Sequence, residues 1–152
     1  MKFKEITISE TLTIKELALS DLAQAYPVIS QLRTHLSLTD YLALAGEMEA
    51  NAYQVLCLFE EDQVVAYAGF TKGTNLYYGR HVWVYDLVTD QAKRGKGYGK
   101  LLLSCVEGLA KDHGLECIAL SSRFAMKDAH WFYENAMGYD KIGYVFKRDL
   151  RN

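Results

Sequence analysis

Three glycines alternate with basic and aromatic residues in the run RGKGYGK, residues 94–100. Glycines leave no side chains where the chain turns from a strand into a helix, so successive backbone N–H groups can converge there on an anion. The positive end of the helix dipole adds to this attraction, as do the side chains of Arg94, Lys96 and Lys100. The segment therefore predicts a cradle for a pyrophosphate. Taken alone, the same residues could also form a tight turn on a basic surface.

Two other phosphate-binding motifs fit this segment poorly. A P-loop requires Gly-Lys followed by Ser or Thr, whereas each Gly-Lys pair here is followed by glycine or leucine. A dinucleotide-binding fingerprint lies near the start of its domain, with an acidic residue after the next strand. Here the loop comes late, and Ser121-Ser122-Arg123 follows that strand.

The elements on either side of the loop must position it. Residues 81–89 (HVWVYDLVT) have the β-branched and aromatic composition of a strand, and residues 98–113 carry the apolar stripe of an amphipathic helix ended by Gly114. Residues 117–121 (CIALS) predict a short buried strand. A right-handed crossover through the helix would make the two strands parallel neighbours.

The N-terminal half predicts a strand, two helices and a hairpin. Apolar residues from Leu12 to Leu19 mark the strand, with a slip in alternation that suggests a bulge, and Ser20 and Asp21 are expected to cap the following helix. Helical patterning runs over residues 22–49 and is broken near residues 36–37. Residues 53–59 and 64–70 predict an antiparallel hairpin, and residues 73–79 a loop.

The C-terminal part predicts a helix over residues 128–137, ended by Gly138, and one last strand over residues 141–149. The strand is centred on Ile142–Phe146, because Ile142, Tyr144 and Phe146 alternate with less apolar positions. We expect it to lie beside residues 117–121, at an edge that a second protomer could also use. With hairpins first and a βαβ unit after them, the sheet should be mixed.

Composition limits the class of protein. A chain of 152 residues, half of them hydrophobic, with one proline and no repeat, is expected to form a single domain over residues 1–152. The net charge of −2 gives no support for a nucleic-acid or membrane partner. Three cysteines lie within apolar patterns without metal-ligand spacing, so free thiols and no metal are expected. The lack of a signal-like or membrane-spanning run predicts a cytoplasmic protein.

Two segments together resemble the GNAT superfamily of N-acetyltransferases. Arg94-Gly-Lys-Gly-Tyr-Gly99 is similar to that family's acetyl-CoA loop, Arg/Gln-x-x-Gly-x-Gly/Ala, and the preceding strand ends in Asp86-Leu-Val-Thr89. Residues 128–139 (DAHWFYENAMGY) resemble the family's Phe-Tyr-Glu helix. Met126-Lys127-Asp128 departs from the family where many members have asparagine. The resemblance implies a three-layer α+β fold, with a mostly antiparallel mixed sheet and a central splayed pair of parallel strands.

The resemblance also implies a donor, acetyl-CoA, and roles for particular residues. The pantetheine arm would enter between the splayed strands, and a backbone N–H there would polarise the thioester carbonyl. Tyr133 matches the family's general acid, which protonates the departing thiolate, and His130 lies one turn before it. The donor-binding residues implied are Leu87, Val88, Thr89, Arg94, Gly95, Lys96, Gly97, Tyr98, Gly99, Lys100, His130 and Tyr133.

The base and the acceptor are less constrained. Asp86 is the first candidate for the base that takes the proton of the amine, acting directly or through a water, and His81 is the second. Arg33, His35, Tyr77 and Arg80 could line an acceptor pocket. The predicted activity is N-acetylation of a primary amine of a small molecule or peptide. A longer acyl donor and a non-catalytic acyl-CoA sensor are the alternatives.

Overall fold

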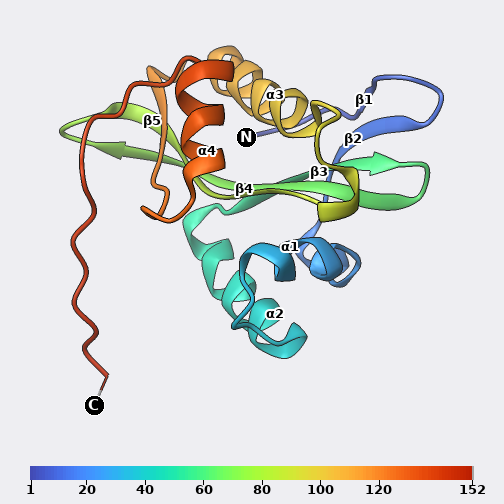
Figure 1. Cartoon of the computed structure of the whole chain (residues 1–152), viewed down its shortest axis with the longest axis horizontal. Coiled ribbons are helices and arrows are strands. Elements are labelled where there is room, and N and C mark those ends of the chain that lie inside the picture. Colours follow the sequence, from blue (N-terminus) through green and yellow to red (C-terminus); the bar gives the residue numbers. More distant parts are fainter. Residues whose placement is uncertain (152) are drawn as a thin grey trace. The chain divides into compact units, whose positions relative to one another are not determined.

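The computed structural model describes residues 1–151 (Figure 1). The chain divides into two compact units, Met1–Ala119 and the residues from Leu120 onward. The first unit holds most of the sheet and the helices on its two faces. The second holds one helix and the C-terminal segment.

Residues 1–151 form one six-stranded sheet in the order β1-β2-β3-β4-β5-β6. The first five strands are antiparallel to their neighbours, and β6 runs parallel to β5. The predicted mixed α+β sheet with a parallel pair is therefore confirmed. The strands are β1 (Ile6–Thr7), β2 (Leu12–Glu16), β3 (Gln54–Glu60), β4 (Gln63–Asn75), β5 (Gly79–Thr89) and β6 (Cys117–Leu120).

Helices cover both faces of this sheet within the first unit (Figure 1). On one face lie the 3₁₀ turn η1 (Leu19–Ala25), α1 (Tyr26–Leu32), α2 (Leu38–Met48) and the turn η2 (Glu49–Asn51); α3 (Tyr98–Asp112) lies on the other. Burial on both faces explains why β3 is apolar at successive positions rather than at alternate ones. The predicted break between the first two helices is confirmed, since Ser37 caps α2 by accepting a 3.1 Å hydrogen bond from the Asp40 amide.

The N-terminal strand differs from its prediction. Strand β2 ends at Glu16, and η1 begins at Leu19, so the apolar pattern continues after the strand has stopped. The predicted caps Ser20 and Asp21 are wrong. Both lie inside the first turn of η1, whose N-cap is Ala18, and no side chain bonds to the amides there. The short β1, which pairs with β2, was not predicted because it spans only two residues.

The predicted loop over residues 73–79 is shorter in the structure. Strand β4 continues to Asn75 and pairs with β5 as far as Asn75 and Gly79. The turn then closes on the Asn75 side chain, whose Oδ1 accepts hydrogen bonds from the amides of Tyr77 (3.0 Å) and Tyr78 (2.6 Å). Long-range pairing here outweighs the low strand propensity of glycine and asparagine.

A β-bulge interrupts the pairing of β4 with β5. Gly69 pairs with Asp86 and Phe70 with Val84, so Tyr85 is the extra residue on β5. A Cβ atom on Gly69 would lie 1.9 Å from the Tyr53 hydroxyl oxygen and 2.9 Å from an Asp86 carboxylate oxygen. Glycine at this position therefore leaves the space in which those two side chains meet.

The second unit contains α4 (Lys127–Trp131), which continues directly into a π-helical turn, η4 (Phe132–Ala136). The helix predicted over residues 128–137 is confirmed in position, and Gly138 follows it with a φ of +71°. The amide of Tyr139 then donates a 2.7 Å hydrogen bond to the Tyr133 carbonyl. The π-helical turn was not predicted, because no sequence pattern marks it.

The predicted C-terminal strand is wrong. Residues 139–151 contain neither helix nor strand, and β6 is the last strand in the order of the described sheet. Ile142 is 58% exposed and Phe146 is 93% exposed, so most of the apolar face of this segment is open to solvent. Alternation specifies which side chains share a face, but a strand also requires a neighbouring strand to bond to.

We expect Gly69→Ala to destabilise the fold by about 1–3 kcal/mol, because the added methyl group overlaps the buried Tyr53 ring. Urea denaturation of both proteins measures the change. Gly46→Ala is the matched control. Gly46 lies in α2 with nothing near its Cβ position, so alanine there should stabilise by about 0.5–1 kcal/mol. Equal effects of the two substitutions would contradict the packing that the structure shows around Gly69.

Candidate active site

The glycine loop leads directly into α3. Gly95 and Gly97 have φ values of +82° and +81°, a left-handed conformation that favours glycine, and no atom lies within 4 Å of a Cβ built at either position. Gly97 is the N-cap of α3 and supplies no side-chain cap. The first-turn amides of the helix therefore lie beside open space, as a site for an anion requires.

Two of the loop's side chains hold it to the sheet. Lys93 Nζ lies 2.6 Å from Glu60 Oε1, and the Tyr98 hydroxyl donates a 2.6 Å hydrogen bond to Glu60 Oε2. Both hydrogen bonds lower the pKa of Glu60, and the bond from Lys93 has the larger effect. Lys93 is thus neutralised at the end of β3, while the Tyr98 hydroxyl anchors the start of α3.

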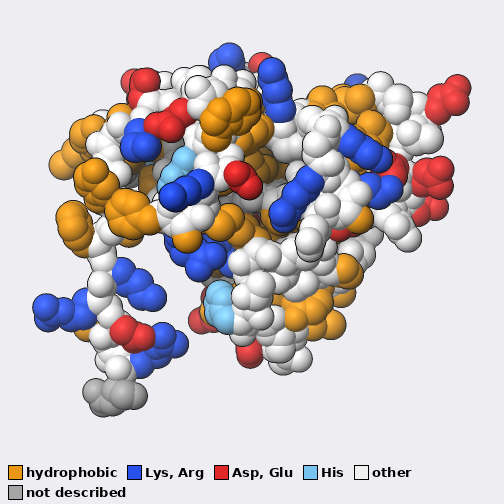
Figure 2. Space-filling view, in the orientation of Figure 1, with side chains coloured by type: hydrophobic (Ala, Val, Ile, Leu, Met, Phe, Trp, Pro, Cys, Tyr) orange, Lys and Arg blue, Asp and Glu red, His pale blue; other side chains and the backbone are white. Residues whose placement is uncertain are grey.

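The remaining loop cations are available for an anion. Arg94 Nε donates a 3.2 Å hydrogen bond to the Thr89 carbonyl, which leaves its other guanidinium N–H groups unused by described residues. Lys96 and Lys100 are exposed and make no ion pair with any residue among 1–151. Figure 2 shows Lys and Arg side chains gathered over the region where this loop lies. These three cations lie in and beside the open glycine loop, and their binding of a pyrophosphate stays a prediction.

The end of β5 extends beyond its parallel neighbour. The Glu116 amide donates a 2.7 Å hydrogen bond to the Arg80 carbonyl, which fixes the register just before β6. In that register β6, four residues long, ends beside Tyr85. Residues 87–89 pair with β4 on one side only, and no described strand covers their other side. Such a strand edge can accept backbone hydrogen bonds from an extended ligand.

Asp86, next to the bulge, is nearly buried at 9% exposure and is held by two partners. Its Oδ1 accepts a 2.8 Å hydrogen bond from Arg33 Nε, and its Oδ2 a 2.6 Å bond from the Tyr53 hydroxyl. Arg33 also donates a 2.7 Å bond to the Tyr85 carbonyl. The structure therefore brings together two residues that the sequence suggested separately, Asp86 and Arg33.

Three buried tyrosines form a chain of hydrogen bonds that ends at Asp86. The Tyr41 hydroxyl donates to Tyr67, and the Tyr67 and Tyr53 hydroxyls are also 3.0 Å apart. Since Tyr53 donates to Asp86, it must accept from Tyr67, so all three O–H dipoles point toward the carboxylate. Burial raises the pKa of Tyr41 to about 12, and raises the pKa values of Tyr53 and Tyr67 well above 10. All three therefore stay protonated at neutral pH.

Sequence reasoning missed these tyrosines as functional neighbours of Asp86. Tyr53 and Tyr67 sit in apolar runs, YQVLCLF and VVAYAGF, where a ring is most simply explained as core packing. The sequence did contain one chemical indication of this cluster. A buried phenol needs a partner for its hydroxyl, and Asp86 was the acidic residue within the strongest predicted strand.

The second candidate base is placed elsewhere. His81 is buried near the start of β5, where its Nδ1 lies 3.0 Å from the Gly79 carbonyl oxygen and its ring packs near Tyr78. It precedes Asp86 by five residues, or roughly 16 Å along a strand. The structure therefore does not bring His81 to the Asp86 cluster.

Of the four residues suggested for an acceptor pocket, only Arg33 lies at Asp86. Tyr77 is 75% exposed in the β4–β5 turn, His35 is exposed after α1, and Arg80 lies 3.8 Å from Glu116 across the start of β6. No described hydrogen bond, ion pair or ring contact joins these three residues to the cluster around Asp86.

Tyr133 and His130 belong to the second unit. Tyr133 lies in the π-helical turn with the rings of Phe132 and Tyr139 at centroid distances of 5.4 and 6.1 Å. Burial raises the pKa of its phenol, so the hydroxyl stays protonated at neutral pH and has a proton to give. His130 is half-buried in α4, three residues earlier, on the same side of the helix.

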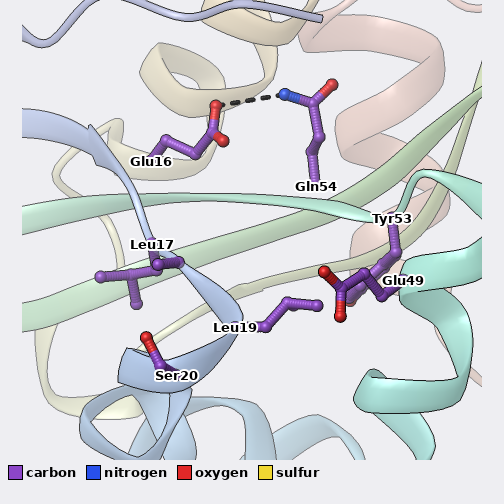
Figure 3. Close-up of a pocket in the computed structure, with 8 residues that line it drawn as sticks. Glu16, Leu17, Leu19, Ser20, Glu49, Tyr53 and Gln54 are labelled. Carbon is purple, nitrogen blue, oxygen red and sulfur yellow. Dashed lines mark hydrogen bonds between the residues drawn. The ribbon is translucent and has the colours of Figure 1, made fainter.

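A cavity of about 520 Å³ opens beside the start of β3 (Figure 3). Glu16 and Gln54 are joined across it by a 3.1 Å hydrogen bond, and Glu49 and Tyr53 lie close together at its other side. It is lined by Glu16, Leu17, Ala18, Leu19, Ser20, Glu49, Tyr53 and Gln54. Only Tyr53 connects this cavity to Asp86.

Neither a metal-binding cluster nor a membrane-spanning helix is found within residues 1–151. No three His, Cys, Asp or Glu side chains come together there in an arrangement that could hold a metal ion. No helix in this part of the chain has both the length and the apolar composition needed to cross a bilayer.

Comparison with known proteins decides the family. The model of the acetyltransferase (GNAT) family matches residues 17–139, which include the loop, the end of β5 and the Tyr133 helix. The chain belongs to the GNAT acetyltransferase family. This acetyltransferase is also 37% identical over 129 residues to the uncharacterized N-acetyltransferase YhdJ of Bacillus subtilis (strain 168), an alignment that covers 84% of this chain and 91% of YhdJ.

Solved structures share the fold of this acetyltransferase. The aminoglycoside N-acetyltransferase AAC(6')-Iy, solved in complex with CoA, superposes with a TM-score of 0.81 at 14% identity, covering 96% of this chain and 100% of that one. The ribosomal-protein-alanine N-acetyltransferase of Brucella melitensis biovar Abortus 2308 superposes with a TM-score of 0.74 at 19% identity, covering 90% and 99%. At these identities the likeness concerns the fold.

We expect Gly97→Glu to abolish the thermal stabilisation of this acetyltransferase by acetyl-CoA. The new carboxylate would enter the open space beside Gly97 and repel the pyrophosphate. Differential scanning fluorimetry with and without acetyl-CoA measures the shift.

Gly114→Glu is the matched control for that experiment. Gly114 also has a positive φ, +69°, and open space at its Cβ position, but it lies past the other end of α3. Backbone strain and added charge are therefore similar in the two variants. Only Gly97→Glu should lose the thermal stabilisation by acetyl-CoA. A folded Gly97→Glu protein that is stabilised like the parent would exclude the loop as the phosphate site.

Proposed function

We propose that this chain is an N-acetyltransferase that moves the acetyl group of acetyl-CoA directly onto a primary amine of a small molecule or peptide. The observation that carries the proposal is the open, left-handed glycine loop at the start of α3, next to a strand end that has one uncovered edge. We also propose that residues 1–152 act as one domain in the cytoplasm. The family match supports the single domain, because it runs across both compact units.

The donor would be held in two places. Amides of the loop and of the first turn of α3 would bind the pyrophosphate, with Arg94, Lys96 and Lys100 around it. The pantetheine arm would pair with the uncovered edge of residues 87–89, and an N–H group of Leu87, Val88 or Thr89 would donate to the thioester carbonyl oxygen. The complete proposed donor site is Leu87, Val88, Thr89, Arg94, Gly95, Lys96, Gly97, Tyr98, Gly99, Lys100, His130 and Tyr133.

Transfer would proceed without a covalent enzyme intermediate. The neutral amine nitrogen attacks the thioester carbon, the tetrahedral intermediate carries its negative charge on the oxygen, and the C–S bond then breaks. Tyr133 gives its proton to the departing CoA sulfur, and a base takes one proton from the new N–H⁺ group. Burial raises the pKa values of Cys57 and Cys105, which disfavours a thiolate nucleophile at either position.

Asp86 is our first candidate for the base, with His81 the second. The Asp86 carboxylate already accepts bonds from Arg33 and Tyr53, but each oxygen keeps one lone-pair direction for a water or an ammonium group. A proton received through a water could then be passed to solvent. The fixed negative charge would also attract a protonated amine toward the end of β5.

A panel of primary amines tests the activity, with CoA thiol release as the signal. We expect at least one small-molecule or peptide amine to be acetylated, with the product identified by a mass increase of one acetyl group. Aminoglycosides and alanine-containing peptides are included, because two proteins of this fold are named as an aminoglycoside N-acetyltransferase and a ribosomal-protein-alanine N-acetyltransferase. Acetyl-CoA binding without turnover on any amine would support a sensor instead.

Tyr133→Phe should lower kcat by about 10²–10⁴ while leaving the acetyl-CoA dissociation constant unchanged, because only the transferable proton is lost. Burial raises the Tyr133 pKa above its ordinary value of 10.0. The kcat of the parent should therefore not fall through loss of this proton until the pH exceeds 10.0. Tyr144→Phe removes a hydroxyl from an exposed ring and is the control. If kcat of Tyr133→Phe is within a factor of about two of the parent value, Tyr133 is not the general acid, and His130 or a water molecule would be the candidate instead.

Asp86→Asn should lower kcat by about 10²–10⁴, because an amide cannot accept the proton. Tyr53→Phe removes a hydrogen bond to the same carboxylate but leaves the carboxylate itself, so its kcat should fall less than about tenfold. Kinetics of both variants across the pH range separate the two effects. Equal decreases in kcat in the two variants would mean that Asp86 has a structural role only. The base would then be His81 or a chain of waters.

A further inference from the structure

The glycine loop is held at both ends and open in between. At its entry, Asp90 caps the short turn η3 (Gln91–Lys93) by accepting a 3.2 Å hydrogen bond from a backbone amide of the turn. At its exit, the Tyr98 hydroxyl donates a 2.6 Å hydrogen bond to Glu60. Between these two points, the amides of residues 95–97 donate no hydrogen bond to a backbone carbonyl among residues 1–151. A ligand can therefore bond them without displacing a backbone partner.

The hydrogen bond from Tyr98 to Glu60 takes the place of a side-chain cap at the start of α3. Many helices are fixed at this end by an N-cap side chain that bonds one of the first amides. The N-cap here is Gly97, which has no side chain, so the first amides stay free. Tyr98, the first residue of α3, is buried and holds the helix through its own hydroxyl. The start of α3 is thus fixed without using any of the amides.

Glu60 is a well-fixed point of attachment for the loop. It is the last residue of β3, and it pairs with Leu12 of β2 on one side and with Gln63 of β4 on the other. Its two carboxylate oxygens have different partners, since Oε1 lies 2.6 Å from Lys93 Nζ and Oε2 accepts the Tyr98 bond. A single carboxylate therefore holds the residue before the glycines and the residue at the start of the helix.

This attachment also brings a negative charge to the start of α3. The hydrogen bond from Lys93, and then that from Tyr98, lower the pKa of Glu60, so its carboxylate is ionised at neutral pH. Charges are screened only beyond about 8 Å at physiological ionic strength, so an unpaired carboxylate here would oppose a bound anion. Lys93 lies against the carboxylate, and the two charges cancel.

We propose that Glu60 is a positioning residue of the donor site, which holds the start of α3 through the Tyr98 hydroxyl while Lys93 neutralises its charge. Lys93 then favours acetyl-CoA binding without touching the donor. This inference rests on the proposed function, because it takes the glycine loop as the phosphate site. The loop motif alone does not contain it, since Glu60 precedes its two partners by 33 and 38 residues.

A charge-removal cycle tests the role of Lys93, with acetyl-CoA dissociation constants measured by isothermal titration calorimetry. Lys93→Met leaves the Glu60 carboxylate unpaired, so its dissociation constant should rise at least roughly fivefold at low salt, and less at high salt. Lys93→Met/Glu60→Gln removes both charges and should return to within about threefold of the parent. A double variant as weak as Lys93→Met would mean that Lys93 binds phosphate itself. That result, or unchanged binding by Lys93→Met, overturns the proposal.

Two variants of Glu60 test the hydrogen bond to Tyr98. Glu60→Gln and Glu60→Ala both remove the charge, but only glutamine keeps an oxygen that can accept from the hydroxyl. The acetyl-CoA dissociation constant of Glu60→Ala should therefore exceed that of Glu60→Gln by at least roughly fivefold. In both variants, kcat at saturating acetyl-CoA should stay within about twofold of the parent. Equal dissociation constants, or a loss of kcat in Glu60→Ala, would contradict a positioning role in donor binding.

The matched control is Lys15→Met. Lys15 Nζ lies 3.8 Å from Glu5 Oε1, and neither residue belongs to the proposed donor site, so acetyl-CoA binding should equal that of the parent. The parent protein separates the two proposals. If the parent does not bind acetyl-CoA, the proposed function fails and this inference fails with it. If the parent binds acetyl-CoA but the Glu60 and Lys93 variants bind equally well, only the positioning role of Glu60 is overturned.

Discussion

The buried Asp86 carboxylate is the constraint on which the candidate active site depends. A buried charge is costly unless it is paired and hydrogen-bonded, and here Arg33 and Tyr53 satisfy one oxygen each. The bulge at Tyr85 turns Asp86 toward them, and Gly69 leaves the space in which they meet. Because Arg33 also bonds the Tyr85 carbonyl, the same interaction fixes the end of α1 against β5.

Strand β3 connects this carboxylate to the glycine loop. Tyr53, just before β3, bonds Asp86, whereas Glu60, the last residue of β3, bonds both Lys93 and Tyr98. One rigid strand thus determines where the candidate base and the start of α3 lie. Loss of either end would move one part of the site relative to the other, although neither Tyr53 nor Glu60 belongs to the predicted catalytic or donor-binding residues.

Sequence alone was sufficient wherever the signal is local. The apolar period of α3, the hairpin of β3 and β4, the mixed sheet and the open glycine loop all follow from neighbouring residues. The Asp86 cluster could not be predicted, because its hydrogen bonds join residues 33 and 53 positions apart and depend on a bulge. Asp86 could be chosen by its chemistry, but its partners required the fold.

Residues 140–150 show why a regular side-chain pattern can still give a wrong strand prediction. Alternation of Ile142, Tyr144 and Phe146 is a requirement for one-sided burial, but a strand also needs a neighbouring strand to bond to. Those side chains are exposed, and one edge of β6 has no strand partner among residues 1–151. The alternation is a property of neighbouring residues, whereas strand pairing depends on what the rest of the fold brings beside them.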